Sequence, residues 1–275
     1  MSAYARPSTL EDALHLMQDG RHRLLAGGTD IYPGAGRALA GDVLDLTGID
    51  ALRGFSSTDG LRIGGCATWT DIAEAALPDA MAALQMAARA VGGRQVQNVG
   101  TIAGNLCNAS PAADGVPPLL VCDAVVELAS VRGVRRVALA EFITGPRKTV
   151  LAADEVMVAV HIPAAGLQGR SVFLKLGARA YLVISIAMVA VRLVRDGERV
   201  GDIAVAVGAC SGVAQRLPRV EHALIGAPLR DVAGLVRASD VMASLQPIAD
   251  IRASADYRAT AAAELVARAV AQVAM

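Results

Sequence analysis

Two glycine-bearing segments of this sequence are best suited to bring the backbone close to a ligand. The first is "AGGTD", in which Gly27 and Gly28 precede Thr29 and Asp30. Such a turn can adopt positive φ and present consecutive N–H groups to an anion, and the Thr29 hydroxyl adds a donor. Its spacing is neither GxGxxG nor GxxxxGK, which disfavours a Rossmann or P-loop site. Taken alone, the segment also fits a plain tight turn.

The second segment, "TIAGNLCNASPAAD", covers residues 101–114 and is denser in small polar residues, which we interpret as a loop. The alternative is a loop in which Asn and Ser merely satisfy the backbone. Two such loops in one domain favour a large phosphate-bearing ligand, because a dinucleotide needs more than one of them. The residues concerned are Thr101, Gly104, Asn105, Asn108, Ser110 and Asp114.

Composition excludes several other classes of function. Lys+Arg and Asp+Glu both number 26, and the absence of a basic run argues against a nucleic-acid partner. The apolar fraction of 54% is typical of a globular protein. The N-terminus carries charged residues and lacks the apolar core of a secretory signal, so we expect a cytoplasmic location. The longest uncharged run, Ala180–Val191, is too short to span a membrane, and we expect a buried strand there.

Cysteine and histidine spacing gives no metal-binding pattern. The four histidines form no HExxH, so no metal site is expected in this chain. Four scattered thiols without CxxC suit a reducing compartment, where we expect them to act as small buried hydrophobes. They are Cys66, Cys107, Cys122 and Cys210.

The elements that must position the two segments fall into three parts. In the first 50 or so residues, a helix capped by Ser8 or Thr9 and strands in "RHRLLAG" and "GDVLDLTGI" form a small α/β unit. Residues 52–163 alternate strands with helices, including a Thr-capped helix in "ATWTDIAEA". From residue 169, "SVFLKLG", "LVISIAMVAVRLV" and "DIAVAVGAC" predict an antiparallel meander followed by helices. The last helix should pack through Ala261, Leu265 and Ala269.

Five ordered blocks resemble one family: the FAD-binding middle subunit of molybdenum hydroxylases, the xanthine dehydrogenase and aerobic carbon monoxide dehydrogenase group. The resemblance covers residues 6–270 and implies an α+β chain. Two α/β subdomains of the vanillyl-alcohol-oxidase type, about 1–52 and 53–168, would hold FAD, and 169–275 would form a C-terminal domain of antiparallel sheet and helices. The blocks are "RPSTLEDALHLM…RLLAGGTDIYP", "LRIGGCATWTDI", "VGTIAGNLCNASPAAD", "FITGPRKTVLAADEVMVAVHIP" and "DIRASADYRATAAAELVARAV".

The resemblance also implies which residues contact a noncovalent FAD. In the second segment Thr101, Gly104, Asn105 and Asp114 match the family's contacting positions, with Asp114 on the ribose or adenosine side. Met157 is carried over as a backbone contact. Around the pyrophosphate, the first segment would wrap Leu25, Ala26, Gly27, Gly28, Thr29, Asp30 and Ile31.

Lys175 is carried over as a flavin-side residue. A cation near the N1–C2=O edge would stabilise the anionic reduced flavin and raise its potential. Arg179 and Tyr181 are further candidates for tuning the flavin. The alternatives are a surface lysine at a strand end and a tyrosine in the core.

Two departures from the family pattern bear on function. The usual "GGN" is Ala103-Gly104-Asn105 here, which a backbone contact should tolerate. Xanthine-type members have acidic residues after the Lys and Arg, whereas this chain has "RAYLVIS" with Leu182 at that place. NAD as the acceptor therefore stays open, and the segment looks more like members that act on N-heterocycles or aromatic acids. There is no four-cysteine insertion, so no additional iron–sulfur cluster is expected in this chain.

The implied function is that of an electron-transferring oxidoreductase subunit. A large molybdopterin subunit would oxidise a substrate C–H, and a small subunit with two [2Fe-2S] clusters would pass electrons singly to FAD, which would deliver them to NAD or another acceptor. The subunits would form a dimer of heterotrimers. One alternative is a self-contained FAD-dependent oxidoreductase of the same superfamily, which the lack of an acid–base pair near the loops disfavours. The other is a flavin-free assembly module, against which the intact glycines argue.

Overall fold

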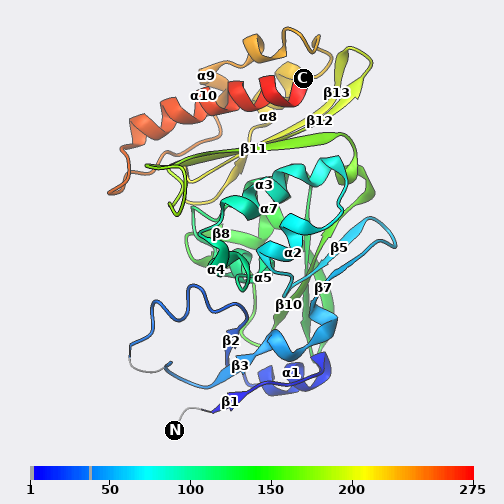
Figure 1. Ribbon diagram of the computed structural model, residues 1–275, viewed down its shortest axis with the longest axis vertical. Helices are drawn as coiled ribbons and strands as arrows, with labels where there is room; N and C mark the ends of the chain where they lie inside the picture. The colour runs from blue at the N-terminus through cyan, green and yellow to red at the C-terminus, as the bar shows by residue number, and fades with distance from the viewer. Residues whose placement is uncertain (1–2, 37–38) are drawn as a thin grey trace.

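Successive parts of the chain lie one above another in the computed structural model, which describes residues 3–36 and 39–275 (Figure 1). The N-terminal strands are at the bottom of the view, a mixed helix and strand region is in the middle, and the last helices are at the top. The architecture is α+β. Between its main elements lie short 3-10 helices at Leu46–Gly48, Asp50–Leu52, Asp79–Met81, Ala164–Leu167 and Val232–Leu235.

The N-terminal unit is a three-stranded parallel sheet with one helix. Its strands are β1 (Tyr4–Ala5), β2 (Arg23–Leu25) and β3 (Val43–Asp45), in the order β1-β3-β2. Helix α1 (Leu10–Met17) begins after Thr9, whose hydroxyl accepts a hydrogen bond from the Asp12 N–H. The chain then turns at Gly20, where φ is +65°. The predicted α/β unit and its helix start are confirmed.

The middle region contains a five-stranded antiparallel sheet in the order β4-β5-β10-β6-β7. The strands are β4 (Phe55–Ser56), β5 (Leu61–Gly64), β6 (Val125–Ser130), β7 (Gly133–Ala138) and β10 (Val156–Ile162). A separate hairpin consists of β8 (Ile143–Gly145) and β9 (Lys148–Thr149). The helices are α2 (Trp69–Glu74), α3 (Ala82–Ala90), α4 (Arg94–Gln97), α5 (Ile102–Asn108), α6 (Val116–Val121) and α7 (Leu139–Phe142).

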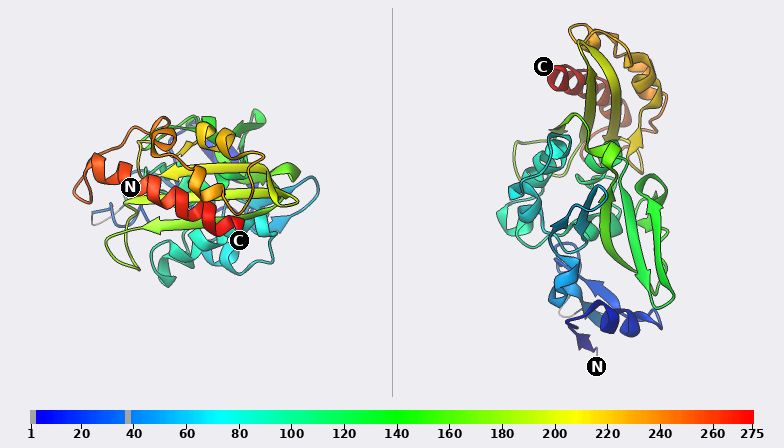
Figure 2. Two further views of the ribbon diagram at one scale, coloured as in Figure 1. Left: turned by 90° about the horizontal axis from the view of Figure 1, so that it is seen from above. Right: turned by 90° about the vertical axis from the view of Figure 1, so that its right-hand side faces the viewer.

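The C-terminal region is an antiparallel meander with helices on both faces. Strands β11 (Arg170–Leu176), β12 (Ala187–Asp196), β13 (Arg199–Gly208) and β14 (Gln215–Arg216) are neighbours in chain order. Helices α3 and α6 pack on one face of this sheet, and α8 (Pro218–Leu224) and α10 (Ala255–Ala274) pack on the other. Figure 2 shows α10 lying across the strands. Between α8 and α10 lies α9 (Ala238–Met242). Alternate residues of β12 therefore belong to two different cores. Met188 and Ala190 join the core on the side of α3 and α6, and Val189 and Val191 join the core on the side of α8 and α10.

Two local predictions were wrong. The strand expected over 180–191 begins only at Ala187, because β12 pairs with β11 from Ala187 onward, and the Tyr181 side chain before it is 81% exposed. Residues 101–114 are not one loop, since α5 occupies Ile102–Asn108. The prediction for α10 is confirmed: Ala269 is buried, and Ala261 and Leu265 pack against the same core beside the fully buried Ala262, Val266 and Val270.

Two features that the sequence did not predict are a membrane-spanning helix and a metal site. Over 3–36 and 39–275, no helix is long and apolar enough to cross a bilayer. Over the same ranges, His, Cys, Asp and Glu side chains form no cluster that could hold a metal ion.

Candidate functional site

A cavity of about 880 Å³ lies where β2, α5, the β8–β9 hairpin, the start of β10 and residues 182–184 meet. Its volume falls at the upper end of the range for ligand and cofactor sites. The structure brings most of the predicted contact residues to its wall: Ala26, Gly27, Gly28, Thr29, Asp30, Ile31, Thr101, Gly104, Asn105, Asp114 and Met157. The wall does not include the other predicted residues, Leu25, Lys175, Arg179 and Tyr181.

The glycine turn is shaped first by contacts within the chain. Gly28 has φ +68°, a conformation that favours glycine. A Cβ on Gly27 would lie 2.0 Å from the Val99 carbonyl oxygen, and one on Gly28 would lie 2.3 Å from the Tyr32 ring. The Gly28 carbonyl accepts a hydrogen bond from the Tyr32 N–H at 2.9 Å. A side chain at position 27 would clash with the backbone, and one at position 28 would be strained by the positive φ, so both substitutions disturb the turn before any ligand binds.

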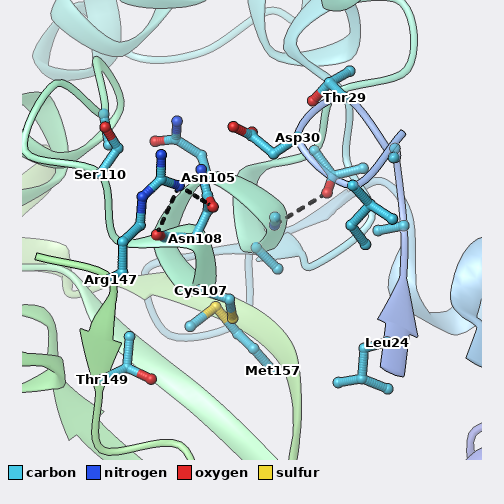
Figure 3. Close-up of a pocket in the computed structure, with 18 of the residues that line it drawn as sticks. Leu24, Thr29, Asp30, Asn105, Cys107, Asn108, Ser110, Arg147, Thr149 and Met157 are labelled. Atoms are coloured by element: carbon cyan, nitrogen blue, oxygen red, sulfur yellow. Dashed lines mark hydrogen bonds between the residues drawn. The ribbon is translucent and has the colours of Figure 1, made fainter. Parts of the chain in front are cut away.

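Helix α5 faces the turn across the cavity (Figure 3). Thr101 is its N-cap, and the Thr101 hydroxyl accepts a hydrogen bond from the Gly104 N–H at 3.1 Å. One turn further on, the Asn105 Oδ1 atom is buried and has no hydrogen-bond partner in the described structure. Buried polar atoms are nearly always paired, so this orphaned acceptor marks a place where a ligand donor fits.

Asp114 and Lys175 contact each other. The Lys175 Nζ lies 2.6 Å from the Asp114 carboxylate and also donates to the Ala90 carbonyl oxygen at 3.1 Å. The Ser185 hydroxyl donates to the other Asp114 oxygen at 2.5 Å. Burial raises the pKa of the Asp114 carboxyl, and the Lys175 ammonium opposes that rise. Asp114 lies on the cavity wall, and Lys175 stands behind it as its ion-pair partner. The adenosine-side role of Asp114 and the flavin-side role of Lys175 stay predictions.

The two other flavin-tuning candidates lie at the surface. Arg179 donates two hydrogen bonds to the Leu182 carbonyl oxygen, at 3.2 and 2.5 Å, which closes the loop between β11 and β12. Tyr181, at the tip of that loop, is solvent-exposed, which excludes the core alternative. From this loop the cavity wall takes Leu182, Val183 and Ile184.

One charged residue of the wall, Arg147, was not among the predicted site residues. Arg147, in the β8–β9 turn, has φ +60° and donates its backbone N–H to the Ala109 carbonyl oxygen at 2.8 Å. Its guanidinium donates to the side chain and carbonyl of Asn108, as Figure 3 shows. Within the described part of the chain, Arg147 is the one Lys or Arg of the cavity wall. The "GPRKT" turn was the available signal, since it lies inside a block that carries the resemblance.

Two family descriptions match nearly the whole chain. Residues 1–165 match the FAD binding domain in molybdopterin dehydrogenase, and residues 173–273 match the CO dehydrogenase flavoprotein C-terminal domain.

Among curated proteins, the chain is 33% identical over 264 residues to the xanthine dehydrogenase FAD-binding subunit of Escherichia coli O157:H7, covering 94% of this chain and 90% of the relative. It is 32% identical to the nicotine 6-hydroxylase medium subunit of Paenarthrobacter nicotinovorans, covering 97% and 95%. Among solved structures, carbon monoxide dehydrogenase from Hydrogenophaga pseudoflava superposes with a TM-score of 0.90 at 27% identity, covering 98% of this chain and 96% of that one. Quinoline 2-oxidoreductase from Pseudomonas putida 86 superposes with a TM-score of 0.87 at 26% identity, covering 100% and 97%.

Proposed function

This chain belongs to the family of FAD-binding subunits of molybdopterin dehydrogenases, and we propose that it passes electrons from an iron–sulfur partner to the final acceptor of such a complex. Its cofactor is FAD, and it is the flavoprotein component of an oxidoreductase. Several relatives are described as medium subunits or medium chains. Those descriptions support an assembly in which this chain is one of several subunits.

The single observation that carries the proposal is the cavity between the glycine turn and α5. It has the volume for a dinucleotide, it offers the orphaned Asn105 Oδ1, and Arg147 supplies positive charge at its wall. The residues present therefore fit FAD. Bound there, FAD would take up electrons one at a time and release them as a pair, which side chains cannot do.

Of the three carboxylates that the described residues place on the cavity wall, those of Asp114 and Glu155 are held in ion pairs, and that of Asp30 is exposed beside the glycine turn. Asp114 is held by Lys175, and Glu155 accepts two hydrogen bonds from Arg135 at 2.6 and 2.8 Å. Carboxylates held in ion pairs are poor general bases, since the partner cation stabilises the ionised form. A self-contained FAD oxidoreductase would need such a base near its substrate.

The finer assignments of the proposal follow from the resemblance. A large subunit with molybdopterin would oxidise the substrate, a small subunit with two [2Fe-2S] clusters would supply electrons, and NAD or another acceptor would receive them. We propose a dimer of such heterotrimers in the cytoplasm, where the four free thiols would stay reduced. We further propose that residues 1–168 form an FAD-binding domain of the vanillyl-alcohol-oxidase type, with subdomains at about 1–52 and 53–168, and that 169–275 form the second domain.

Purification of the chain tests the core of the proposal. The protein should be yellow, or become so with added FAD, and denaturation should release FAD and not FMN. Asn105→Ala should weaken FAD binding about 5-fold, the effect of one net hydrogen bond. Asn98→Ala is the matched control, because Asn98 is a surface residue bonded to Thr70. A colourless protein that takes up no FAD would refute the function.

Affinity capture tests the partners. The tagged chain, co-expressed in its native host, should retain a large molybdopterin protein and a small iron–sulfur protein. Turnover of a substrate by the isolated chain, without partners, would instead support the self-contained oxidoreductase.

A further inference from the structure

One of the five blocks that carry the family resemblance contributes no residue to the cavity wall. Within the described chain the other four blocks each supply wall residues, whereas residues 250–270, "DIRASADYRATAAAELVARAV", supply none. These residues form the turn before α10 and most of that helix. Apolar side chains of α10 are enough to pack the helix on the sheet. The buried charge of the block, Arg258, therefore calls for a separate explanation.

Arg258 is a buried cation in the first turn of α10. Its side chain is 1% exposed, and its Nη2 atom donates to the Asp250 carboxylate at 2.6 Å. The Arg252 backbone N–H and the guanidinium groups of Arg258 and Arg252 lower the pKa of the Asp250 carboxyl to about 2, so Asp250 is ionised. A buried charge is costly unless it is paired and hydrogen-bonded. The ion pair explains how Arg258 is tolerated, and its other contacts show what it holds.

The second terminal nitrogen of Arg258 binds two strand ends. Its Nη1 atom donates to the Ile186 carbonyl oxygen at 2.5 Å and to the Ala209 carbonyl oxygen at 2.8 Å. Ile186 is the residue just before β12, and Ala209 is the residue just after β13. One side chain from α10 thus holds neighbouring ends of the two central strands of the C-terminal sheet.

The strand end at Ile186 continues into the cavity wall. The wall takes residues 182–184 from the loop that precedes it, and the Ser185 hydroxyl donates to the wall residue Asp114 at 2.5 Å. In Figure 1 this loop and the start of α10 lie on the same, left-hand side of the C-terminal sheet. The end of the loop is therefore tied to the wall at Ser185 and to Arg258 at Ile186.

The strand end at Ala209 reaches a second part of the wall. The Ala209 N–H donates to the Pro111 carbonyl oxygen at 2.9 Å, and Pro111 lies between Ser110 and Ala112, which line the cavity. Ala209 has φ +63°, which is unfavourable for a residue with a side chain and persists only where the surroundings fix it. Arg258 fixes the carbonyl of this residue from one side, as Pro111 fixes its N–H from the other.

We propose that Arg258, held by Asp250, is a positioning residue for the cofactor site, which fixes residues 182–186 and 110–112 from outside the cavity. Arg258 is not on the wall, so it acts through these two segments and not on the ligand itself. Segments that are already ordered lose less entropy when a ligand binds. The inference deepens the proposed function, on which it rests, because the site that Arg258 serves is the FAD site.

Limited trypsin digestion of the flavin-free protein measures whether the loop is held. Trypsin cuts after Lys and Arg, and Arg179 is exposed in the loop that ends at Ile186. Arg258→Met removes the guanidinium, so cleavage after Arg179 should be about 10-fold faster than in wild type, because it follows the population of the open loop. Cleavage should stay confined to this loop, since a general loss of structure would spread it over the 26 Lys and Arg residues.

Flavin affinity is the second measurement. The FAD dissociation constant, from flavin fluorescence, should rise about 10-fold in Arg258→Met, because the ligand must then order the loop. Saturating FAD should slow the cleavage again. Arg252→Met is the matched control, since Arg252 is exposed and its guanidinium donates to the same Asp250 carboxylate at 2.9 Å. That control should match wild type in both measurements.

Asp250→Asn is the second variant, and it decides the matter if Arg258→Met does not fold. It keeps the arginine but removes the charge that holds it, so both effects should be smaller and in the same direction. The inference is overturned if the folded variant matches wild type in either measurement, or if cleavage spreads over the whole chain. In those cases wild type still binds FAD and the proposed function stands. A wild-type protein that binds no FAD overturns both.

Discussion

Replacement of Lys175 by methionine tests whether this lysine is a structural partner of Asp114 or a contact of the flavin. The Lys175 and Asp114 side chains are 12% and 8% exposed and 2.6 Å apart. Methionine fills most of the same volume but leaves Asp114 buried with Ser185 as its remaining partner. Removing one partner of a buried ion pair destabilises a protein by about 3–5 kcal/mol. For a chain of this size that corresponds to a fall in melting temperature of roughly 6–20 °C.

The assay is urea and thermal unfolding of the flavin-free protein, followed by circular dichroism. Lys148→Met is the matched control, because Lys148 is the only other lysine of the sequence and is exposed. That control should change the unfolding free energy by less than about 0.5 kcal/mol. The double variant Asp114→Asn/Lys175→Met removes both charges and should be more stable than Lys175→Met, since no unpaired carboxylate is left.

Either of two results would refute the coupling of Lys175 to Asp114. If Lys175→Met keeps the stability of the flavin-free protein but loses FAD affinity, the lysine acts on the ligand and the ion pair contributes little. If the double variant is as unstable as the two single variants added together, the charges are not coupled. The expected pattern is a large loss of stability in the single variant and its partial recovery in the double.

Three further predictions follow from local geometry. The Arg135 guanidinium holds the pKa of the Glu155 carboxyl below its usual value; this stabilisation is present above about pH 4.3 and lost as pH falls, so the stability difference between wild type and Glu155→Gln should shrink in urea titrations from pH 7 to 3. Cys66, Cys122 and Cys210 are buried, and burial raises the pKa of their thiols to about 11 or 12, so these three should not react with a disulfide reagent in the native protein at pH 8. Cys107 lines the cavity and is the thiol expected to react, and rapid native labelling of more than one thiol would contradict this. Thr68→Ala should remove the capping box made with Asp71 at the start of α2 and lower the free energy of unfolding by about 1 kcal/mol in urea titrations. An unchanged titration midpoint would show that the cap contributes nothing.

Local signals were sufficient for much of the fold. The Thr9 and Thr68 caps start the predicted helices because a side-chain oxygen beside an N-terminal N–H needs no distant partner. The Asp196-Gly197 turn likewise fixes the hairpin of β12 and β13 within a few residues. The start of β12 was missed because the run from Ala180 carries no charge, and only the pairing with β11 sets the first residue of the strand at Ala187.

The sequence was sufficient to predict which backbone segments line the cavity, but not which charged side chains pair with one another there. Glycine turns and caps are local, so the two segments that line the cavity were identified from their residues alone. The ion pair joins Asp114 to Lys175, 61 residues further along, and nothing near either residue encodes the partner. The orientation of the Arg147 side chain was equally unpredictable, because its guanidinium is held by Asn108, 39 residues earlier in the chain. Long-range charge pairing requires the tertiary structure.

The glycine turn shows why a local sequence pattern predicts a backbone conformation but not the group that packs against it. A missing Cβ permits close approach in the same way whether the neighbour is a ligand or another part of the chain. Here the neighbour of Gly27 is the Val99 carbonyl, so the turn is held against the residues that precede α5 by the fold itself. A turn fixed in this way does not have to be ordered by the cofactor, which lowers the entropy lost on binding. On the proposed function, the glycines would contribute to FAD affinity by shaping the site in advance, and contacts with the ligand would come from backbone and polar side chains of the wall such as Asn105.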